Sequence, residues 1–254
     1  MSIAKPFHRI WRPLKGYNPF EIVNLDKPRR TIDYLVDDRF ACQAEMRSLV
    51  TTAHLIIHDL YELFNYIEPD NSNLGVFSHR IYELFLRSAT EFEANCKGIL
   101  DANGYAGSGN LNVKDYFKIA LEAKLYDYIV IYDRWTSHYV FKPFIEWNVQ
   151  TYTPLTWYQQ YNEVKHNRYH NFHMANLENL MNAISGLLCI LHAQYGEEMQ
   201  SACFEGISMA QDSEAKVETG TFNIIAPTFQ DAEQYDFVWN DIKNQPDPVQ
   251  IFNF

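Results

Sequence analysis

The stretch YNEVKHNRYHNFHMANLENL, residues 161–180, gathers the side chains best suited to acid–base or phosphate chemistry. Five cationic or titratable residues fall within nine positions: Lys165, His166, Arg168, His170 and His173. Histidine exchanges a proton near neutral pH, and the planar guanidinium of arginine can hold a phosphate. The spacing therefore favours a site that binds a phosphate and moves a proton. The alternative is a solvated turn between two helices, because Lys and His are favourable at a helix C-terminus.

Two asparagines extend this cluster. Asn162 lies one turn before His166 on the same helical pattern, and Asn176 begins the next helical segment. With Arg168 and His173 they leave two interpretations open. One is a phosphate pocket around a single helix junction. The other is a hydrogen-bonded turn in which the Asn side chains cap backbone groups.

A carboxylate on an earlier helical segment is a further candidate. Glu91 lies at the edge of the apolar face of segment 76–102, so we expect it to be partly buried. A buried carboxylate needs a partner. Either Arg87, four residues away, forms an ordinary ion pair with it, or Glu91 reaches Arg168 or His173 and orients that group. The nearer partner, Arg87, is favoured.

Other chemistries have weaker signals. His54, His58 and Glu62 share one helix face with metal-site spacing, but polar neighbours make that face a solvated stripe, so we predict no metal. The four cysteines lie apart in helical patterns, which predicts reduced, buried thiols. The sequence contains no G-x-G-x-x-G, Walker-type or G-x-S-x-G motif, so we predict no cofactor.

Helices must position these residues. Four segments show helical periodicity of apolar residues: 38–67, 76–102, 155–168 and 174–199. Asn112 is placed as the N-cap of a shorter helix, and β-branched and aromatic residues within 126–152 indicate short strands or irregular packed segments. We therefore predict a mainly α protein. Its architecture would be an antiparallel helical bundle with a small β or irregular insert and a non-helical C-terminal tail.

Composition divides the chain into three parts. Residues 1–30 hold seven Lys or Arg against two acidic residues, which predicts an irregular basic arm. Residues 31–205 would form the helical-bundle domain, and 206–254 an acidic tail with one strand near 216–229. The net charge of −11 argues against general nucleic-acid binding but not against a local cationic site. We find no signal peptide or membrane-spanning segment, which predicts a cytoplasmic protein.

Arg168, followed by four residues and then His173, resembles the R-x4–6-H motif of the HEPN superfamily of helical-bundle proteins, many of which are ribonucleases. A second formal match, Arg47 with His54, lies in the middle of a predicted helix. Element order over about residues 38–200 is also similar to that of HEPN domains. These have a long helical hairpin, a connecting region, a helix ending in the motif and a final apolar helix.

The resemblance implies a metal-independent endoribonuclease with Arg168 and His173 as its catalytic pair, in a toxin or antiphage defence role. It also implies a homodimer in which the motifs of two protomers converge on RNA. Glu91, Asn162 and His166 would support the pair. Catalytic members typically carry Asn, Asp or His directly after the arginine, whereas this chain has Tyr169. The alternative is a non-catalytic bundle of the same fold that binds a partner protein or a nucleotide through this junction.

Overall fold

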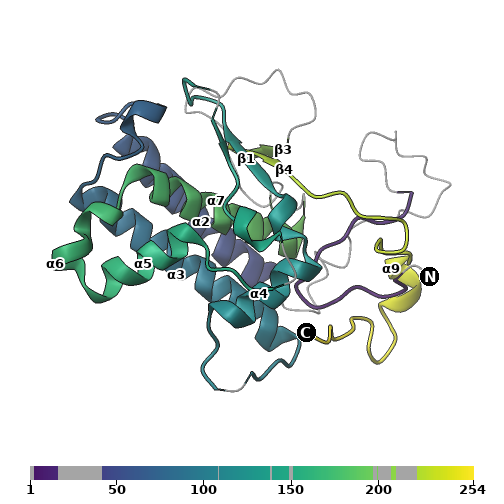
Figure 1. The fold of residues 1–254 in the computed structure, drawn as a ribbon. Helices are drawn as coiled ribbons and strands as arrows, with labels where there is room; N and C mark the ends of the chain where they lie inside the picture. Colours follow the sequence, from purple (N-terminus) through teal and green to yellow (C-terminus); the bar gives the residue numbers. More distant parts are fainter. Residues whose placement is uncertain are drawn as a thin grey trace.

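The computed structural model describes residues 3–16, 42–107, 109–137, 139–148, 151–196, 199, 207–209 and 222–254. Helices dominate its regular structure, so the chain is mainly α, as predicted (Figure 1). Some predicted features lie outside these ranges: the helix start at 38, the arm over 17–30 and the tail strand over 216–221. Among the described helices, none combines the length and the apolar character that a membrane crossing requires.

Two long helices follow each other along the chain: α2, Cys42–Leu63, and α3, His79–Ala102, with the 3-10 turn η2, Asn71–Asn73, between them. Ser78 caps α3 by accepting a hydrogen bond from the amide of Ile81. The chain leaves α3 at Gly104, whose φ of +70° is readily adopted only by glycine. The first helix ends four residues before the predicted position 67, because the chain turns at 64–66 ahead of Pro69.

The second helical region contains four elements: α5, Thr156–His166; α6, Arg168–Asn171; the 3-10 turn η5, Phe172–Met174; and α7, Leu177–Tyr195. Its last helix, α7, is buried along most of its length, except at Glu178 and Asn182, and packs against α2, α3 and α5. A helix that is apolar on all sides needs such a central position. It begins at Leu177 rather than at the predicted 174, because Asn176 is its N-cap and accepts a hydrogen bond from the amide of Asn179.

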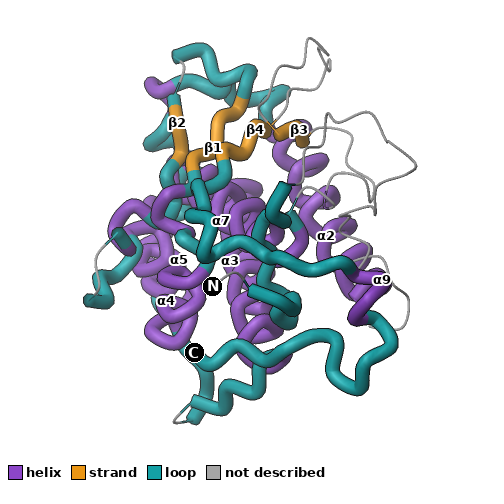
Figure 2. The backbone as a smooth tube through the Cα atoms, turned by 90° about the vertical axis from the view of Figure 1, so that its right-hand side faces the viewer, coloured by secondary structure: helices purple, strands orange, loops and turns teal. Residues whose placement is uncertain are grey.

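A shorter helix and a small sheet complete the framework: α4, Val113–Glu122; η3, Leu125–Asp127; β1, Ile129–Tyr132; β2, Val140–Phe141; η4, Ile145–Trp147; β3, Ile207–Met209; and β4, Phe222–Ile225. Asn112 and Asp115 form a capping box at the start of α4, which confirms the predicted N-cap. The sheet has the order β2-β1-β4-β3 (Figure 2). Its β1 strand pairs with β2 and β4 in antiparallel fashion, and β3 is parallel to β4.

The sheet joins two parts of the chain that the sequence suggested were separate. Val130, in the predicted insert, pairs with Phe141 on one side and with Ile224 of the C-terminal tail on the other. The predicted strand in the tail is therefore present over 222–225, but it completes the sheet of the insert. The tail was expected to be non-helical, and it contains one short helix, α9, Trp239–Ile242. Hydrophobic packing of Trp239, which is buried, holds that turn in place.

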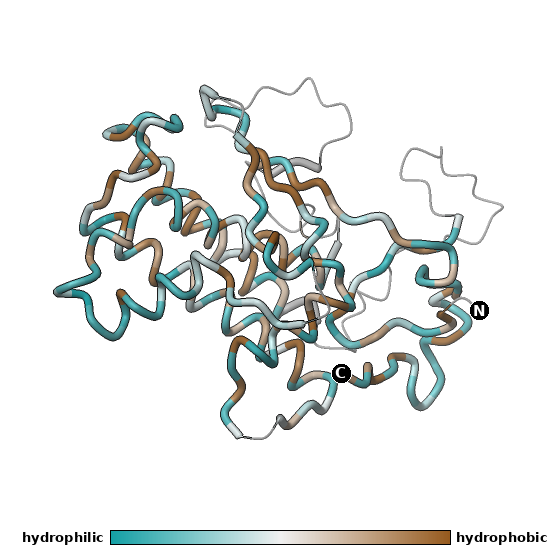
Figure 3. The backbone as a smooth tube through the Cα atoms, in the orientation of Figure 1, coloured by the Kyte–Doolittle hydropathy of each residue, from teal (hydrophilic) through white to brown (hydrophobic). Residues whose placement is uncertain are grey.

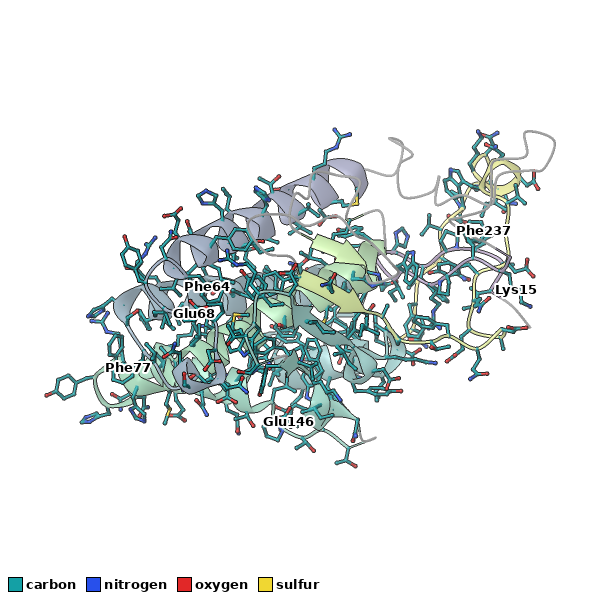
Figure 4. The ribbon with its side chains drawn as sticks, turned by 90° about the horizontal axis from the view of Figure 1, so that it is seen from above. Lys15, Phe64, Glu68, Phe77, Glu146 and Phe237 are labelled. Atoms are coloured by element: carbon teal, nitrogen blue, oxygen red, sulfur yellow. The ribbon has the colours of Figure 1, made fainter. Side chains whose placement is uncertain are left out.

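The N-terminal arm, purple in Figure 1, runs beside the yellow tail and contacts α7. Ile3 and Leu14 form isolated bridges with Tyr235, and the amide of Trp11 donates a hydrogen bond to the carbonyl of Ala193. Segments from the two ends of the chain thus lie side by side against α7. They form an additional layer at the end of the molecule where Figure 4 labels Lys15 and Phe237.

Two arginines of the arm form contacts within the protein. Arg9 donates one hydrogen bond of 2.7 Å to Gln194 Oε1 and another of 2.7 Å to Glu45 Oε1. Arg12 is 5% exposed, and its guanidinium lies 3.4 Å from Glu122 Oε2. These cations are therefore structural and do not contribute to an exposed basic surface.

Candidate functional site

The junction between α5 and α7, residues 165–176, carries the predicted catalytic pair. It lies at the end of the molecule remote from the arm and the tail, where Figure 1 labels α6. The backbone there is coloured predominantly hydrophilic in Figure 3. Lys165, His166, Arg168, His170 and His173 are all exposed. The structure thus presents the cationic cluster to solvent at one end of the helices.

Arg168 is the first residue of α6 and lies against α3. Its Cζ atom is 5.4 Å from the centroid of the Tyr82 ring. Among the described residues no carboxylate pairs with Arg168. A guanidinium that rests on an aromatic face keeps its N–H donors free for an oxyanion. The position of Arg168 is therefore compatible with phosphate binding.

Phe172 attaches the turn after α6 to the start of α3. Its ring centroid lies 5.7 Å from that of Phe77, 4.8 Å from that of His79 and 5.9 Å from that of Tyr82. Figure 4 labels Phe77 at the end of the molecule opposite Lys15. This aromatic cluster fixes the backbone between Arg168 and His173, so the spacing of the pair is set by packing.

The three histidines of the junction have few contacts. His170 packs edge-on against Tyr169, with ring centroids 5.0 Å apart. His166 is the last residue of α5, and His173 lies in η5. Within the described part of the chain, no side chain forms a hydrogen bond with the His173 ring. Within the described part of this chain, the His173 ring therefore has no hydrogen-bond partner that orients it.

Lys165 and Asn162 make contacts within α5. The Lys165 ammonium donates a hydrogen bond of 2.9 Å to the Tyr161 hydroxyl and lies 4.9 Å from the centroid of that ring. This hydrogen bond raises the pKa of Lys165. The Asn162 side chain donates to the carbonyl of Tyr158 at 3.1 Å. Lys165 thus remains a cation beside the junction, whereas the Asn162 amide hydrogen is used by its own helix.

Glu91 is not brought to the motif. Tyr82 marks where Arg168 meets α3, and Glu91 lies nine residues further along, about 13.5 Å at the usual rise of a helix. Arg87, the partner that the sequence favoured for Glu91, is not paired with Glu91 either, because Arg87 donates a hydrogen bond of 2.7 Å to Asp59 of α2. Burial raises the pKa of Glu91, and the nearby charge of Arg87 lowers it. The partner of Arg87 could not be inferred from α3 alone, since Asp59 lies on another helix.

The predicted metal-like spacing on α2 does not assemble into a cluster. Within the described residues, no three His, Cys, Asp or Glu side chains are placed to hold a metal ion. His58 is exposed, and its Nδ1 lies 3.9 Å from Asp59 Oδ1. Two of the cysteines, Cys96 and Cys189, are buried free thiols, and burial raises the pKa of each. Neither has the exposed, anionic character of a reactive cysteine.

The structure contains a pocket beside the junction that the sequence analysis did not predict. It has a volume of about 420 Å³ and lies between β2, η4, α5 and the start of α7. Amide side chains are prominent in its lining: Gln160, Asn176, Asn179 and Asn182. Asn176, which was predicted to belong to the motif cluster, therefore caps α7 and also borders this pocket.

One signal in the sequence points to the pocket. Asn176, Asn179 and Asn182 recur every three residues at the start of an otherwise apolar helix. Such spacing places three amides on one helix face.

Comparison of the chain with protein-family models, curated proteins and solved structures finds no significant match.

Proposed function

We propose that this chain is a metal-independent endoribonuclease of the HEPN type, acting in the cytoplasm as a homodimer. The observation that carries the proposal is the exposed Arg168, which has no carboxylate partner among the described residues and shares its turn with His173. A toxin or antiphage defence role follows from the resemblance of the motif.

The proposal includes a four-helix bundle in which α2 and α5 run opposite to α3 and α7. Four contacts support the directions of α3, α5 and α7: Tyr158–Glu93, Arg168–Tyr82, Asn176–Phe77 and Gln194–Asn95. Residues later in α5 contact residues earlier in α3, so these two helices run in opposite directions. Residues later in α7 contact residues later in α3, so these two run in the same direction. This arrangement places the end of α5 and the start of α7 together at the junction.

The chemistry requires two proton transfers. The 2′-hydroxyl loses a proton and attacks the phosphorus, and the departing 5′ oxygen gains a proton when its bond to phosphorus breaks. Arg168 would stabilise the additional negative charge on the phosphorane. His173 can perform one transfer at a time, so the His173 of a second copy would provide the other. Tyr169, which is 91% exposed, offers the second copy an aromatic contact beside the motif.

A second candidate function is a non-catalytic bundle that binds a partner protein or a nucleotide at the same junction. The unsupported ring of His173 favours it, because a catalytic histidine is normally oriented by a hydrogen bond. Tyr169, in place of a small polar residue after Arg168, favours it too.

Cleavage of RNA by the purified chain in excess EDTA tests the proposal. We expect the wild type to cleave, and Arg168→Ala and His173→Ala to lose at least about a hundredfold in rate. Arg47→Ala and His58→Ala are matched controls on exposed positions of α2 and should retain the rate. Sedimentation of the wild type should show a dimer. RNA binding without cleavage, abolished in the Arg168 variant, would favour the binding module. Cleavage that survives both junction substitutions would exclude the motif as the active site.

A further inference from the structure

The amide-lined pocket next to the junction has a fixed pattern of hydrogen-bonding groups. Asn179 is only 5% exposed, and its Nδ2 donates to Gln160 Oε1 and, at 2.7 Å, to the carbonyl of Met174. The main-chain carbonyl of Met174 can only accept, so it fixes the nitrogen end of the Asn179 amide, and that nitrogen in turn fixes Oε1 of Gln160 as its acceptor. No described residue donates to Asn179 Oδ1. The result is an oriented acceptor without a protein partner, on a side chain that lines the pocket.

Gln160 supplies the complementary group. Its Oε1 accepts the hydrogen bond from Asn179, which leaves its Nε2 as the donor end. Among the described residues, none accepts from this nitrogen. A donor on Gln160 and an acceptor on Asn179 therefore belong to one hydrogen-bonded pair of amides, and both side chains line the pocket. Asn182 adds a second acceptor, since its Nδ2 is occupied by the carbonyl of Glu178.

The charges around the pocket disfavour a phosphate. Lys142 is the cation in its lining, whereas Glu146 and Glu178 are both carboxylates. Glu146 is partly committed, because one of its oxygens accepts hydrogen bonds from the amide and the hydroxyl of Thr156. Glu146 lies at the edge of the molecule in Figure 4. A polyanion would meet net repulsion here, and a neutral polar group would not.

Aromatic side chains form part of the wall. Tyr139, Phe141 and Trp157 line the pocket, and the rings of Tyr139 and Phe141 meet edge to face at 4.9 Å. Trp157 is held by a hydrogen bond of 2.8 Å from its Nε1 to the carbonyl of Pro143. Flat apolar walls combined with a donor–acceptor edge suit a planar heterocycle that is uncharged. A volume of about 420 Å³ is sufficient for such a group.

We infer that this pocket binds one unpaired nucleobase of a single-stranded RNA whose backbone crosses the junction at Arg168. The inference rests on the proposed function, because it assigns part of the same substrate. Asn176 links the two places, since it lines the pocket and lies three residues after His173. Base selection would then come from the amides of Gln160 and Asn179, while Arg168 holds the phosphate irrespective of sequence.

Binding of 2′-O-methyl pentanucleotides of A, C, G and U, each followed by fluorescence anisotropy, tests this inference. These probes cannot be cleaved, because the attacking hydroxyl is blocked. We expect the wild type to prefer one base by about tenfold, the effect of one well-formed pair of hydrogen bonds to a base. Gln160→Leu and Asn182→Leu should each reduce that preference to about twofold or less. Gln159→Leu, an exposed neighbour on α5, is the matched control and should keep it.

The results separate this inference from the proposed function. Equal binding of all four probes, or a preference unchanged in both leucine variants, would overturn the nucleobase pocket even if RNA is cleaved at the junction. A base preference lost in both variants would support the pocket even if Arg168→Ala does not alter cleavage. That second result would contradict the catalytic motif and not the base site. Two pocket variants are included so that misfolding of one, detected by circular dichroism, leaves the other decisive.

Discussion

The guanidinium of Arg168 lies over the ring of Tyr82, with Cζ 5.4 Å from the ring centroid. This contact ties the first residue of α6 to the first turns of α3. It determines where the guanidinium of Arg168 lies relative to α3. Because an aromatic face attracts the cation without occupying its N–H groups, Arg168 is positioned and still available.

Removing the aromatic ring should therefore impair the junction without removing the arginine. In Tyr82→Leu we expect RNA cleavage, or RNA binding if the chain does not cleave, to weaken by about two- to fivefold. That range corresponds to the ~0.5–1 kcal/mol of an exposed cation–π contact. Tyr82→Phe keeps the ring and should behave as the wild type. Equal losses in both variants would show that the hydroxyl, and not the ring, matters.

Arg9 should make a large contribution to stability. Its guanidinium joins Gln194 of α7 to Glu45 of α2. In Arg9→Met we expect the free energy of unfolding in urea to fall by about 2–3 kcal/mol, because Gln194 loses its charged partner in a largely buried place. Lys5→Met is the control in the same arm. Its single hydrogen bond to the carbonyl of Asp247 is exposed, so we expect a change below about 0.5 kcal/mol. A small effect at Arg9 would mean that the arm is not fixed by this contact.

Gly196 provides a test of how tightly the arm is seated. Its φ is +57°, and a Cβ atom there would lie 2.1 Å from Trp11 Nε1. We expect Gly196→Ala to destabilise the fold by more than ~2 kcal/mol, since both backbone strain and a steric clash arise. Gly104→Ala is the matched control, because its φ of +70° is similar but no atom lies within 4 Å of the new Cβ. Thermal unfolding should show a loss of only ~1 kcal/mol for that control. Equal losses would indicate strain alone and no close seating of Trp11.

His192 should make stability depend on pH. Burial lowers its pKa to about 3, whereas the unfolded chain titrates this group near 6.5. Between these values the unfolded state binds the additional proton, so stability falls as pH decreases below about 6.5. His192→Gln should reduce the difference in unfolding free energy between pH 7 and pH 5 by about 2 kcal/mol. Tyr128→Phe removes the hydrogen bond to His192 Nδ1 but keeps the titrating ring, so that difference should persist. An unchanged pH dependence in His192→Gln would contradict the assignment.

Local features of the fold were predictable because they depend on neighbouring residues. Asn112 precedes α4 as a cap, and the apolar period of 177–195 identifies α7. The β-branched and aromatic residues around 129–132 indicated a short strand or an irregular packed segment, and the structure forms strand β1 there. Each of these signals lies within one element, where side-chain spacing determines which face is buried.

Relationships between distant segments were not predictable from spacing. Val130 and Ile224 pair across the sheet although 94 positions separate them in the chain. Arg87 could have served Glu91 on its own helix, but Asp59 on α2 takes its hydrogen bond. Composition identified a basic arm, but only the structure shows that Arg9 of this arm is held by Gln194 and Glu45.

The candidate site divides in the same way. The sequence places Arg168 and His173 in one short turn, and the structure leaves both exposed there. It does not indicate that Gln160 and Asn179 meet, because these amides come from two helices and β2 closes the pocket beside them. Periodicity in the sequence describes one helix at a time, so it cannot predict a pocket that several elements form together.

The pairing of the arm with the tail has a consequence for biosynthesis. Ile3 and Leu14 are synthesised more than two hundred residues before their partner Tyr235. The arm cannot take its place until Tyr235 has been made, and β1 likewise waits for β4. A nascent chain that stops short of the tail leaves Arg12 and Val130 uncovered. Completion of the native state therefore requires the tail, and a product truncated before it exposes surfaces that a chaperone or protease can recognise.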